Sequence, residues 1–105
     1  MTGEALKGHL DLLLLSALQH EPAHGYAIAV RLRHRSNGAF DLAEGTIYPA
    51  LHRLERAGLL SSRWEEGDTR RRRVYQLTGK GAKVLAKRHQ EWLRFSGAVM
   101  EIVGA

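Results

Sequence analysis

Apolar residues at helical spacing dominate this chain, and one region in its middle has the character of two short strands. The first apolar stretch is a dense group of leucines that covers more than one face of a predicted helix, which ends before Glu21-Pro22-Ala23. These leucines are Leu6, Leu10, Leu12, Leu13, Leu14, Leu15 and Leu18. Because such a helix needs burial on several sides, we expect a second contact for it, and a partner subunit is one candidate.

A second helix is predicted from His24-Gly25-Tyr26 to about Ser36, where Asn37-Gly38 supplies a stop signal. Its Ile28 and Leu32 are spaced to face the core. The charged side chains expected on its outer face are Arg31, Arg33, His34 and Arg35.

After a connector over 39–44, a third helix is predicted to begin near Thr46, because Pro49 lacks an N–H and fits only the first turn. Gly58 ends it, in the position that usually follows the last helical turn. Its buried stripe has the spacing i, i+3, i+4 and i+7 and consists of Ile47, Ala50, Leu51 and Leu54. Its exposed faces are polar, aromatic and cationic, and carry Thr46, Tyr48, Pro49, His52, Arg53 and Arg56.

Two short strands are predicted next, over 59–64 and 74–77, on either side of the turn-rich segment 65–69. The arm that returns from this turn carries Arg70, Arg71, Arg72 and Arg73. In isolation such a run is usually a solvated loop. A helix followed by a basic hairpin, however, is the order of elements in a winged DNA-binding unit.

One long helix is predicted from Gly79 to Val103, with Thr78 as its N-cap. A seam of the kind that joins two helices is formed by Ala82, Leu85, His89, Trp92, Ser96, Val99 and Val103. Ala86, Leu93 and Met100 form a neighbouring stripe. A small winged unit cannot cover so wide a face, so we expect a second copy of the chain to pack on it. The alternative is a helix that folds back onto its own domain.

The predicted fold class is mainly α with a small β-hairpin. Residues 1–78 are expected to form a winged helix-turn-helix DNA-binding domain, and residues 79–105 a C-terminal dimerisation helix. A length of 105 residues, 44% of them hydrophobic, suits a single core.

The charge of the chain favours a polyanionic partner, since 16 Lys and Arg residues against 11 Asp and Glu residues give a net charge of +5. No apolar run approaches the roughly 20 residues that span a bilayer. The leucine-rich N-terminal stretch also lacks the shape of a signal peptide. We therefore expect a cytoplasmic protein with no membrane partner.

Neither catalysis nor metal binding is expected. No Ser-His-Asp set, carboxylate pair or phosphate-binding loop appears in a supporting context, so we predict no enzyme and no cofactor. The chain has no Cys, and its six His residues are scattered. His20 and His24 flank Pro22, which prevents them from sharing a regular helix face around a metal.

Three segments together carry a family resemblance. They are Leu12–Leu18 followed by His24-Gly25-Tyr26, the Thr-Ile-Tyr-Pro-Ala-Leu run within 44–55, and the basic-Tyr-x-Leu-Thr-x-x-Gly run within 71–81. In this order they resemble the PadR-type transcriptional regulators. The resemblance implies a dimeric winged helix-turn-helix repressor whose C-terminal helix makes the dimer. Within this family, the chain resembles the compact members with one such helix rather than the phenolic-acid-responsive members with a longer C-terminal region.

A helix in the major groove brings exposed side chains to base edges, so the third helix is the expected recognition helix. Tyr48, His52 and Arg53 are the expected readers, and Arg53 suits a bidentate pair with guanine. Thr46 at the helix N-terminus suits a phosphate, with Pro49 exposed beside it. The hairpin adds Arg70, Arg71, Arg72, Arg73 and Tyr75 to the expected DNA-binding residues.

Two further expectations concern this surface. Taken alone, Arg53 and Arg56 are explained as well by a solvated helix face on which they pair with Glu55 or other acids. Two-fold symmetry predicts an inverted-repeat DNA site with half-sites about one turn, roughly 34 Å, apart.

Trp92 is the residue that we expect at a site where a small molecule relieves repression. The residues expected at the dimer or ligand interface are Leu85, His89, Trp92, Ser96 and Val99. Two facing indoles leave a flat apolar slot that accepts planar aromatic or cationic compounds, and some compact PadR-type members sense multiple drugs at such a site. Equally well, Trp92 fills the interface only as a large hydrophobic side chain.

Two other functions stay open on the sequence. One is a winged-helix protein–protein adaptor, in which the same exposed face docks a protein. The other is an architectural DNA binder without an inducer. The adaptor predicts weak DNA binding with little sequence preference, and the basic hairpin argues against it.

Overall fold

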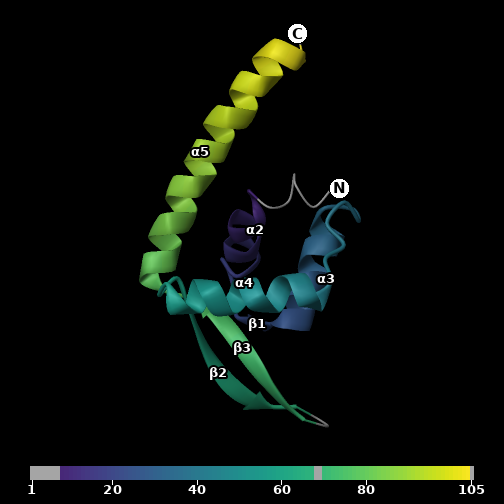
Figure 1. Cartoon of the computed structure of the whole chain (residues 1–105), viewed down its shortest axis with the longest axis vertical. Coiled ribbons are helices and arrows are strands. Elements are labelled where there is room, and N and C mark those ends of the chain that lie inside the picture. The colour runs from purple at the N-terminus through teal and green to yellow at the C-terminus, as the bar shows by residue number, and fades with distance from the viewer. Residues whose placement is uncertain (1–7, 68–69, 105) are drawn as a thin grey trace.

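The computed structural model describes residues 8–67 and 70–104. Its elements are α2 (Leu10–Ala17), β1 (Ala23–His24), α3 (Gly25–Arg35), α4 (Glu44–Arg56), β2 (Leu60–Glu66), β3 (Arg71–Leu77) and α5 (Gly79–Val103). In Figure 1, α2, α3 and α4 lie together, the β2–β3 hairpin extends from one side of them, and α5 extends in the opposite direction. The prediction of a mainly α winged fold with a long C-terminal helix is confirmed.

A single core lies where the short helices meet the base of the hairpin. The predicted stripe of α4 is buried there, with Ile47 and Leu51 fully inaccessible. The other large side chains buried with it are Leu14, Leu15, Ile28, Leu54, Leu60 and Tyr75. Helices α3 and α4 therefore bury the faces that their apolar spacing indicates, whereas most of the seam predicted on α5 is exposed.

The outer face of α3 differs from the prediction at one residue. Arg31 is half-buried, and its guanidinium donates hydrogen bonds to the carbonyl oxygens of Ala17 (2.9 Å) and Glu21 (3.2 Å). The same group pairs with the Glu21 carboxylate at 3.0 Å. Arg31 thus satisfies backbone carbonyls at the end of α2 that have no helical partner, instead of pointing to solvent.

Helix α4 begins two residues earlier than predicted, at Glu44 rather than Thr46. The N–H groups of Thr46 and Ile47 both donate to the carbonyl oxygen of Ala43, so the helix begins upstream of its predicted start. Pro49 therefore lies in the second turn, where its missing N–H removes one helical bond. The end of α4 is as predicted, because Gly58 adopts φ +80° and the N–H of the residue after it reaches back to Leu54.

The sheet has three antiparallel strands in the order β1-β3-β2. The two hairpin strands pair from Leu60↔Leu77 to Glu66↔Arg71, so they extend further toward the turn than predicted. β1 was not predicted, because it is only two residues long and exists through its pairing with β3. Residues 68 and 69 of the turn, like Leu6, lie outside the described residues.

Helix α5 has the predicted bounds, and the Thr78 side chain caps it by accepting the N–H of Gly81 at 3.0 Å. A Cβ atom on Gly81 would overlap the carbonyl oxygen of Leu59, so this turn needs glycine to reach the hairpin. Leu85 is only 7% exposed and belongs to the core of its own chain, which corrects its assignment to the dimer interface. The first turns of α5 therefore pack on their own domain.

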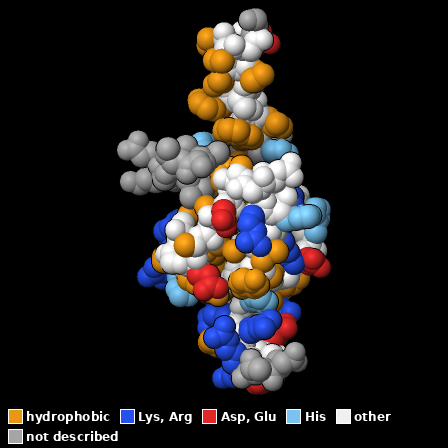
Figure 2. All heavy atoms as spheres, turned by 90° about the vertical axis from the view of Figure 1, so that its right-hand side faces the viewer, with side chains coloured by type: hydrophobic (Ala, Val, Ile, Leu, Met, Phe, Trp, Pro, Cys, Tyr) orange, Lys and Arg blue, Asp and Glu red, His pale blue; other side chains and the backbone are white. Residues whose placement is uncertain are grey.

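The C-terminal half of α5 projects beyond the rest of the chain, as Figure 1 shows. Figure 2 shows apolar side chains along this projecting end. The large exposed hydrophobic residues there are Trp92, Leu93, Phe95, Val99, Met100, Ile102 and Val103. None of the helices in the described residues is long and apolar enough to cross a membrane.

Candidate nucleic-acid interface

We call the β2–β3 hairpin the wing. A hollow of about 650 Å³ lies between α4, the start of α3 and the wing. It brings together the predicted residues Tyr48, His52, Arg70, Arg71, Arg72, Arg73 and Tyr75. Residues that were not predicted also line it: His24, Tyr26, Glu44 and Trp64. Thr46 and Pro49 are exposed on the same helix. Figure 2 shows Lys and Arg side chains gathered over the wing end of the molecule.

Tyr48 is positioned by a glycine on the neighbouring helix. It is half-buried on α4, and its ring covers Gly25, the first residue of α3. A Cβ atom on Gly25 would lie 2.6 Å from Cε1 and Cζ of Tyr48. The absence of a side chain at this position therefore lets the tyrosine ring lie against the helix backbone.

Trp64 organises two of the wing arginines. The guanidinium of Arg71 lies 5.0 Å from the centre of the Trp64 ring, and that of Arg73 lies 5.2 Å from it. Directly opposed residues on antiparallel strands share a face, and Trp64 pairs with Arg73 in the register. An exposed indole thus holds two cations in place by cation–π attraction.

Arg73 also links the wing to α4 by side-chain contacts. Its Nε donates to Oγ of Ser62 at 2.9 Å, and its Nη2 lies 3.5 Å from Oε1 of Glu55 on α4. Ser62 in turn donates to Glu55 at 2.5 Å. Because these bonds join β2, β3 and α4, the angle between wing and helix is restrained by side chains as well as by the hairpin base.

His24 lies where the wing meets α3. Its Nδ1 accepts the N–H of Ala27 at 3.3 Å and so caps α3. Its Nε2 lies 3.2 Å from Nη1 of Arg72 on β3. Burial, followed by the nearby charges of Arg72 and Arg31, lowers the pKa of His24 below its ordinary value of 6.5. The sequence signal for this residue was its position at the start of the predicted second helix.

Arg53, predicted as a base reader, does not line this hollow. Its Nη1 and Nη2 donate to the two carboxylate oxygens of Asp11 on α2, at 3.1 and 2.6 Å. The hydrogen bond from Arg53 lowers the pKa of Asp11, and the same bond raises that of Arg53. The alternative was a pair with Glu55 or another acid. Glu55 pairs with Arg73 instead, and the acid that Arg53 pairs with is Asp11 on α2.

Tyr75 is placed in the wall of the hollow but is not available to DNA in this conformation. Its side chain is fully buried, and its hydroxyl has no hydrogen-bond partner among the described residues. Burial raises the pKa of the Tyr75 phenol. Its assignment as a DNA-contacting residue is therefore corrected to a core residue beneath the wing.

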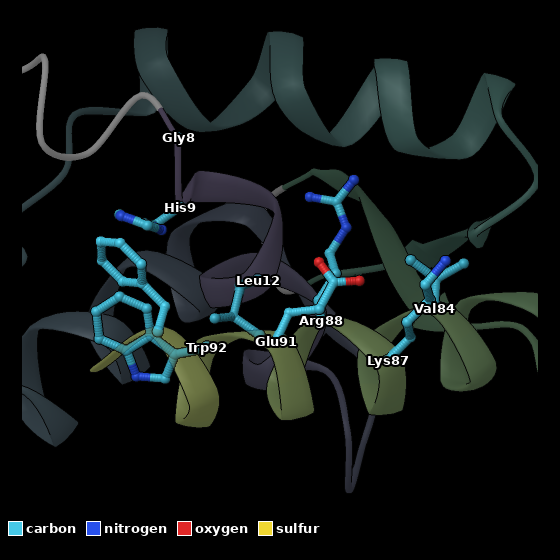
Figure 3. Close-up of a pocket in the computed structure, with 9 residues that line it drawn as sticks. Gly8, His9, Leu12, Val84, Lys87, Arg88, Glu91 and Trp92 are labelled. Carbon is cyan, nitrogen blue, oxygen red and sulfur yellow. The ribbon is translucent and has the colours of Figure 1, made fainter. Parts of the chain in front are cut away.

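A second hollow, of about 490 Å³, lies between the start of α2 and α5 and contains Trp92. In Figure 3, Trp92 and His9 lie at one end of it and Val84 and Lys87 at the other. The Trp92 indole meets the His9 ring edge-on, with centroids 5.0 Å apart. Of the other residues predicted with Trp92, His89 lines a different hollow, beside Leu85, and Ser96 and Val99 lie further along α5.

Within residues 8–67 and 70–104, no group of three or more His, Asp or Glu side chains is arranged to hold a metal ion. Neither hollow therefore presents a metal site among its described residues.

Comparisons with known proteins agree on the family. The model of the transcriptional regulator PadR-like family matches residues 14–87. A transcriptional regulator from Clostridium thermocellum has a similar structure, with a TM-score of 0.87 and 27% identity over 98% of both chains. Bacillus subtilis PadR, solved in complex with operator DNA, aligns with a TM-score of 0.67 and 25% identity over 80% of this chain and 45% of that chain.

One curated relative, the Escherichia coli transcriptional regulator YqjI, is 30% identical over 84 residues, which make up 80% of this chain. The aligned region spans 39% of that protein's length. The fold and the matched family are those of transcription regulators rather than enzymes. This chain therefore belongs to the PadR-like family of transcriptional regulators.

Proposed function

We propose that this protein is a dimeric repressor that binds an inverted-repeat DNA operator through α4 and the wing. The observation that carries the proposal is the hollow between these elements, which four consecutive arginines line. A phosphate backbone binds such a cluster through charge neutralisation and counterion release. The complex of Bacillus subtilis PadR with operator DNA supports the same use of this fold.

The proposed division of roles follows from side-chain placement. Exposed His52 and half-buried Tyr48 are the base-reading candidates, because they line the hollow on the α4 side. Thr46 and Pro49, exposed in the first half of α4, are proposed to lie near the phosphates. Arg70, Arg71 and Arg72 supply the wing charge, whereas Arg53 is engaged by Asp11 and is left out of the reading set.

Dimerisation is proposed to occur through the projecting half of α5. Leu93 is 56% exposed, Met100 63% and Ile102 84%, values that are costly for apolar side chains left in water. A second copy of the same helix would cover them with a matching apolar face. In this arrangement residues 1–78 form the DNA-binding domain and residues 79–105 the dimerisation helix.

The hollow beside Trp92 is the proposed effector site. It combines two aromatic rings, Trp92 and Phe95, with charged residues of both signs, Arg88 and Glu91. A planar aromatic compound suits such a site by stacking, and a cationic one gains cation–π attraction to the indole. Quenching of fluorescence by planar dyes in a Trp64→Phe background, lost on Trp92→Leu, tests this role without the second tryptophan.

The DNA-binding claim is tested by measuring affinity for duplex DNA as a function of salt. A triple variant, Arg70→Ala, Arg71→Ala and Arg72→Ala, leaves the structural Arg73 in place. We expect its affinity to fall at least about tenfold at about 0.1 M salt, and the slope of log affinity against log salt to drop by about 0.9 per lost phosphate contact.

A control variant removes three exposed cations that do not line the hollow between α4 and the wing: Arg33→Ala, Arg35→Ala and Lys83→Ala. It changes the net charge by the same amount as the wing variant. Because the altered residues do not line the hollow, it should keep most of the affinity for DNA. Equal losses in both variants would mean that binding depends on net charge alone. Weak, salt-insensitive binding by the unaltered protein would instead favour the protein–protein adaptor.

A further inference from the structure

The imidazole of His24 lies between two hydrogen-bond donors. On one side the backbone N–H of Ala27 donates to Nδ1 at 3.3 Å. On the other side Nη1 of Arg72 lies 3.2 Å from Nε2. An amide N–H and a guanidinium carry no acceptor, so both neighbours can only donate to this ring.

A neutral imidazole has a single acceptor nitrogen. When Nδ1 of a neutral ring accepts the helix-capping bond, Nε2 carries the proton and its N–H points toward the Arg72 guanidinium; in the other tautomer Nε2 would accept from Arg72. With the proton on Nε2, the contact at 3.2 Å is between two donors rather than between a donor and an acceptor. A ligand oxygen that accepts hydrogen bonds from both Nε2–H of His24 and Nη1–H of Arg72 would give each of these donors an acceptor.

The surroundings of this pair favour an anion. Arg31 on α3 and Arg72 on β3 place positive charge near the imidazole, and both lie with His24 along a shallow hollow at the surface. Tyr26 stacks on the His24 ring with centroids 6.4 Å apart and an interplanar angle of 8°. His24 and Arg72 also line the larger hollow with Tyr48 and Glu44 of α4. A ligand held here therefore lies at the edge of the proposed DNA interface.

We propose that His24 and Arg72 form a clamp for one backbone phosphate of DNA, in which Nε2–H of His24 and Nη1–H of Arg72 donate to the same phosphate group. The clamp rests on the proposed DNA-binding function and adds to it a contact from His24 of β1, the N-cap of α3, outside the recognition helix and the wing. His24 contributes a neutral donor whose direction is set by the helix cap. Arg72 contributes the charge.

This division of labour predicts different salt dependences for the two residues. Loss of a neutral donor releases no counterions, so His24→Asn should lower the affinity about tenfold without changing the salt slope. Asn is a strong N-cap, so α3 keeps its cap and the unfolding midpoint should change little. Arg72→Gln should lower both the affinity and the slope, the latter by about 0.9 for each contact.

The experiment has two parts. Imidazole nitrogen NMR of the free protein is expected to show His24 as the Nε2–H tautomer. A titration with a mixed-sequence duplex at low salt then compares the unaltered protein, His24→Asn and Arg72→Gln. His34→Asn is the control, since His34 is exposed near the far end of α3.

Each outcome has a definite meaning. The Nε2–H tautomer together with a loss of affinity confined to His24→Asn and Arg72→Gln supports the clamp. An Nδ1–H tautomer overturns it, because Nε2 would then accept from Arg72 and close the site. Unchanged binding by His24→Asn also overturns it, while DNA-binding repression stands. If the unaltered protein itself binds no duplex, the proposed function fails, and the clamp with it.

Discussion

Both terminal nitrogens of Arg53 on α4 bond to the two carboxylate oxygens of Asp11 on α2. Arg88 on α5 approaches the same carboxylate, with Nη1 3.6 Å from Oδ2. The Asp11 side chain is 17% exposed and that of Arg53 is 53% exposed, so water screens this contact in part. Asp11 on α2 therefore links α4 to α5.

Replacing Asp11 by Asn should lower the free energy of unfolding by about 1 kcal/mol, because a charge-assisted bidentate bond becomes a weaker one. The pKa of Asp11 is below its ordinary 3.8 in the folded protein, so the carboxylate stabilises the fold above that pH. This stability is lost as the pH falls through the lowered pKa. Urea unfolding at acid and neutral pH should show that Asp11→Asn removes this part of the pH dependence.

The matched control is Asp41→Asn, at an exposed aspartate outside the helices. A double variant with Arg53→Gln provides a second check. If Asp11→Asn and Arg53→Gln destabilise independently and their effects add, the ion pair contributes nothing and the interpretation is wrong.

Gly25→Ala should destabilise the fold by about 1–3 kcal/mol, because the new methyl group would lie 2.6 Å from the Tyr48 ring and force it to move. In a Tyr48→Ala background the same substitution should cost much less. Gly45→Ala is the control, since no heavy atom lies within 4 Å of its added Cβ and it should stabilise α4 by up to about 1 kcal/mol. Chemical denaturation of the unaltered protein and these variants measures the differences, and an equal cost of Gly25→Ala in both backgrounds would contradict the contact.

The lowered pKa of His24 makes stability depend on pH near neutrality. Because the folded protein disfavours the imidazolium, the unfolded chain binds the proton first as the pH falls below the ordinary value of 6.5. Stability should therefore decrease with falling pH through the folded pKa. Thermal unfolding of His24→Asn should show a shallower decrease than the unaltered protein or His34→Asn, and identical curves would exclude a role for His24.

Ile102→Lys should shift the protein from dimer to monomer, since it places a charge on the most exposed large apolar residue of α5. Glu101→Lys, at the neighbouring exposed position, adds a lysine outside the apolar set and should leave the dimer intact. Sedimentation velocity across a range of concentrations distinguishes the two. If the unaltered protein is a monomer, or if the Ile102→Lys variant remains a dimer, α5 is not the dimerisation helix.

The elements that could be predicted from sequence are those set by local signals. The i, i+3, i+4, i+7 spacing in α4 identified residues such as Ile47 and Leu51, which are fully buried. The Thr78 cap and Gly58 stop marked helix ends correctly, because each acts within a few residues of its own position. The wing was predicted for the same reason, although its strands proved longer.

The contacts that could not be predicted join residues far apart in the chain. Arg53 is paired with a carboxylate 42 residues away, and His24 with an arginine 48 residues away. Tyr75 has the polar group of a binding residue, but its pairing with Ala23 in β1 places it beneath the wing. Such pairings depend on how the elements pack, which periodicity within a single element does not specify.

The most direct test of DNA-binding regulation is selection of bound fragments from genomic DNA of the source organism at physiological salt. The wing variant Arg70→Ala, Arg71→Ala, Arg72→Ala serves as the control. We predict enrichment of one inverted repeat, with half-site centres about one helical turn or roughly 34 Å apart, that disappears with the variant. Absence of any enriched site, or enrichment of a single asymmetric site that survives in the variant, would contradict a dimeric repressor that reads DNA with α4 and the wing.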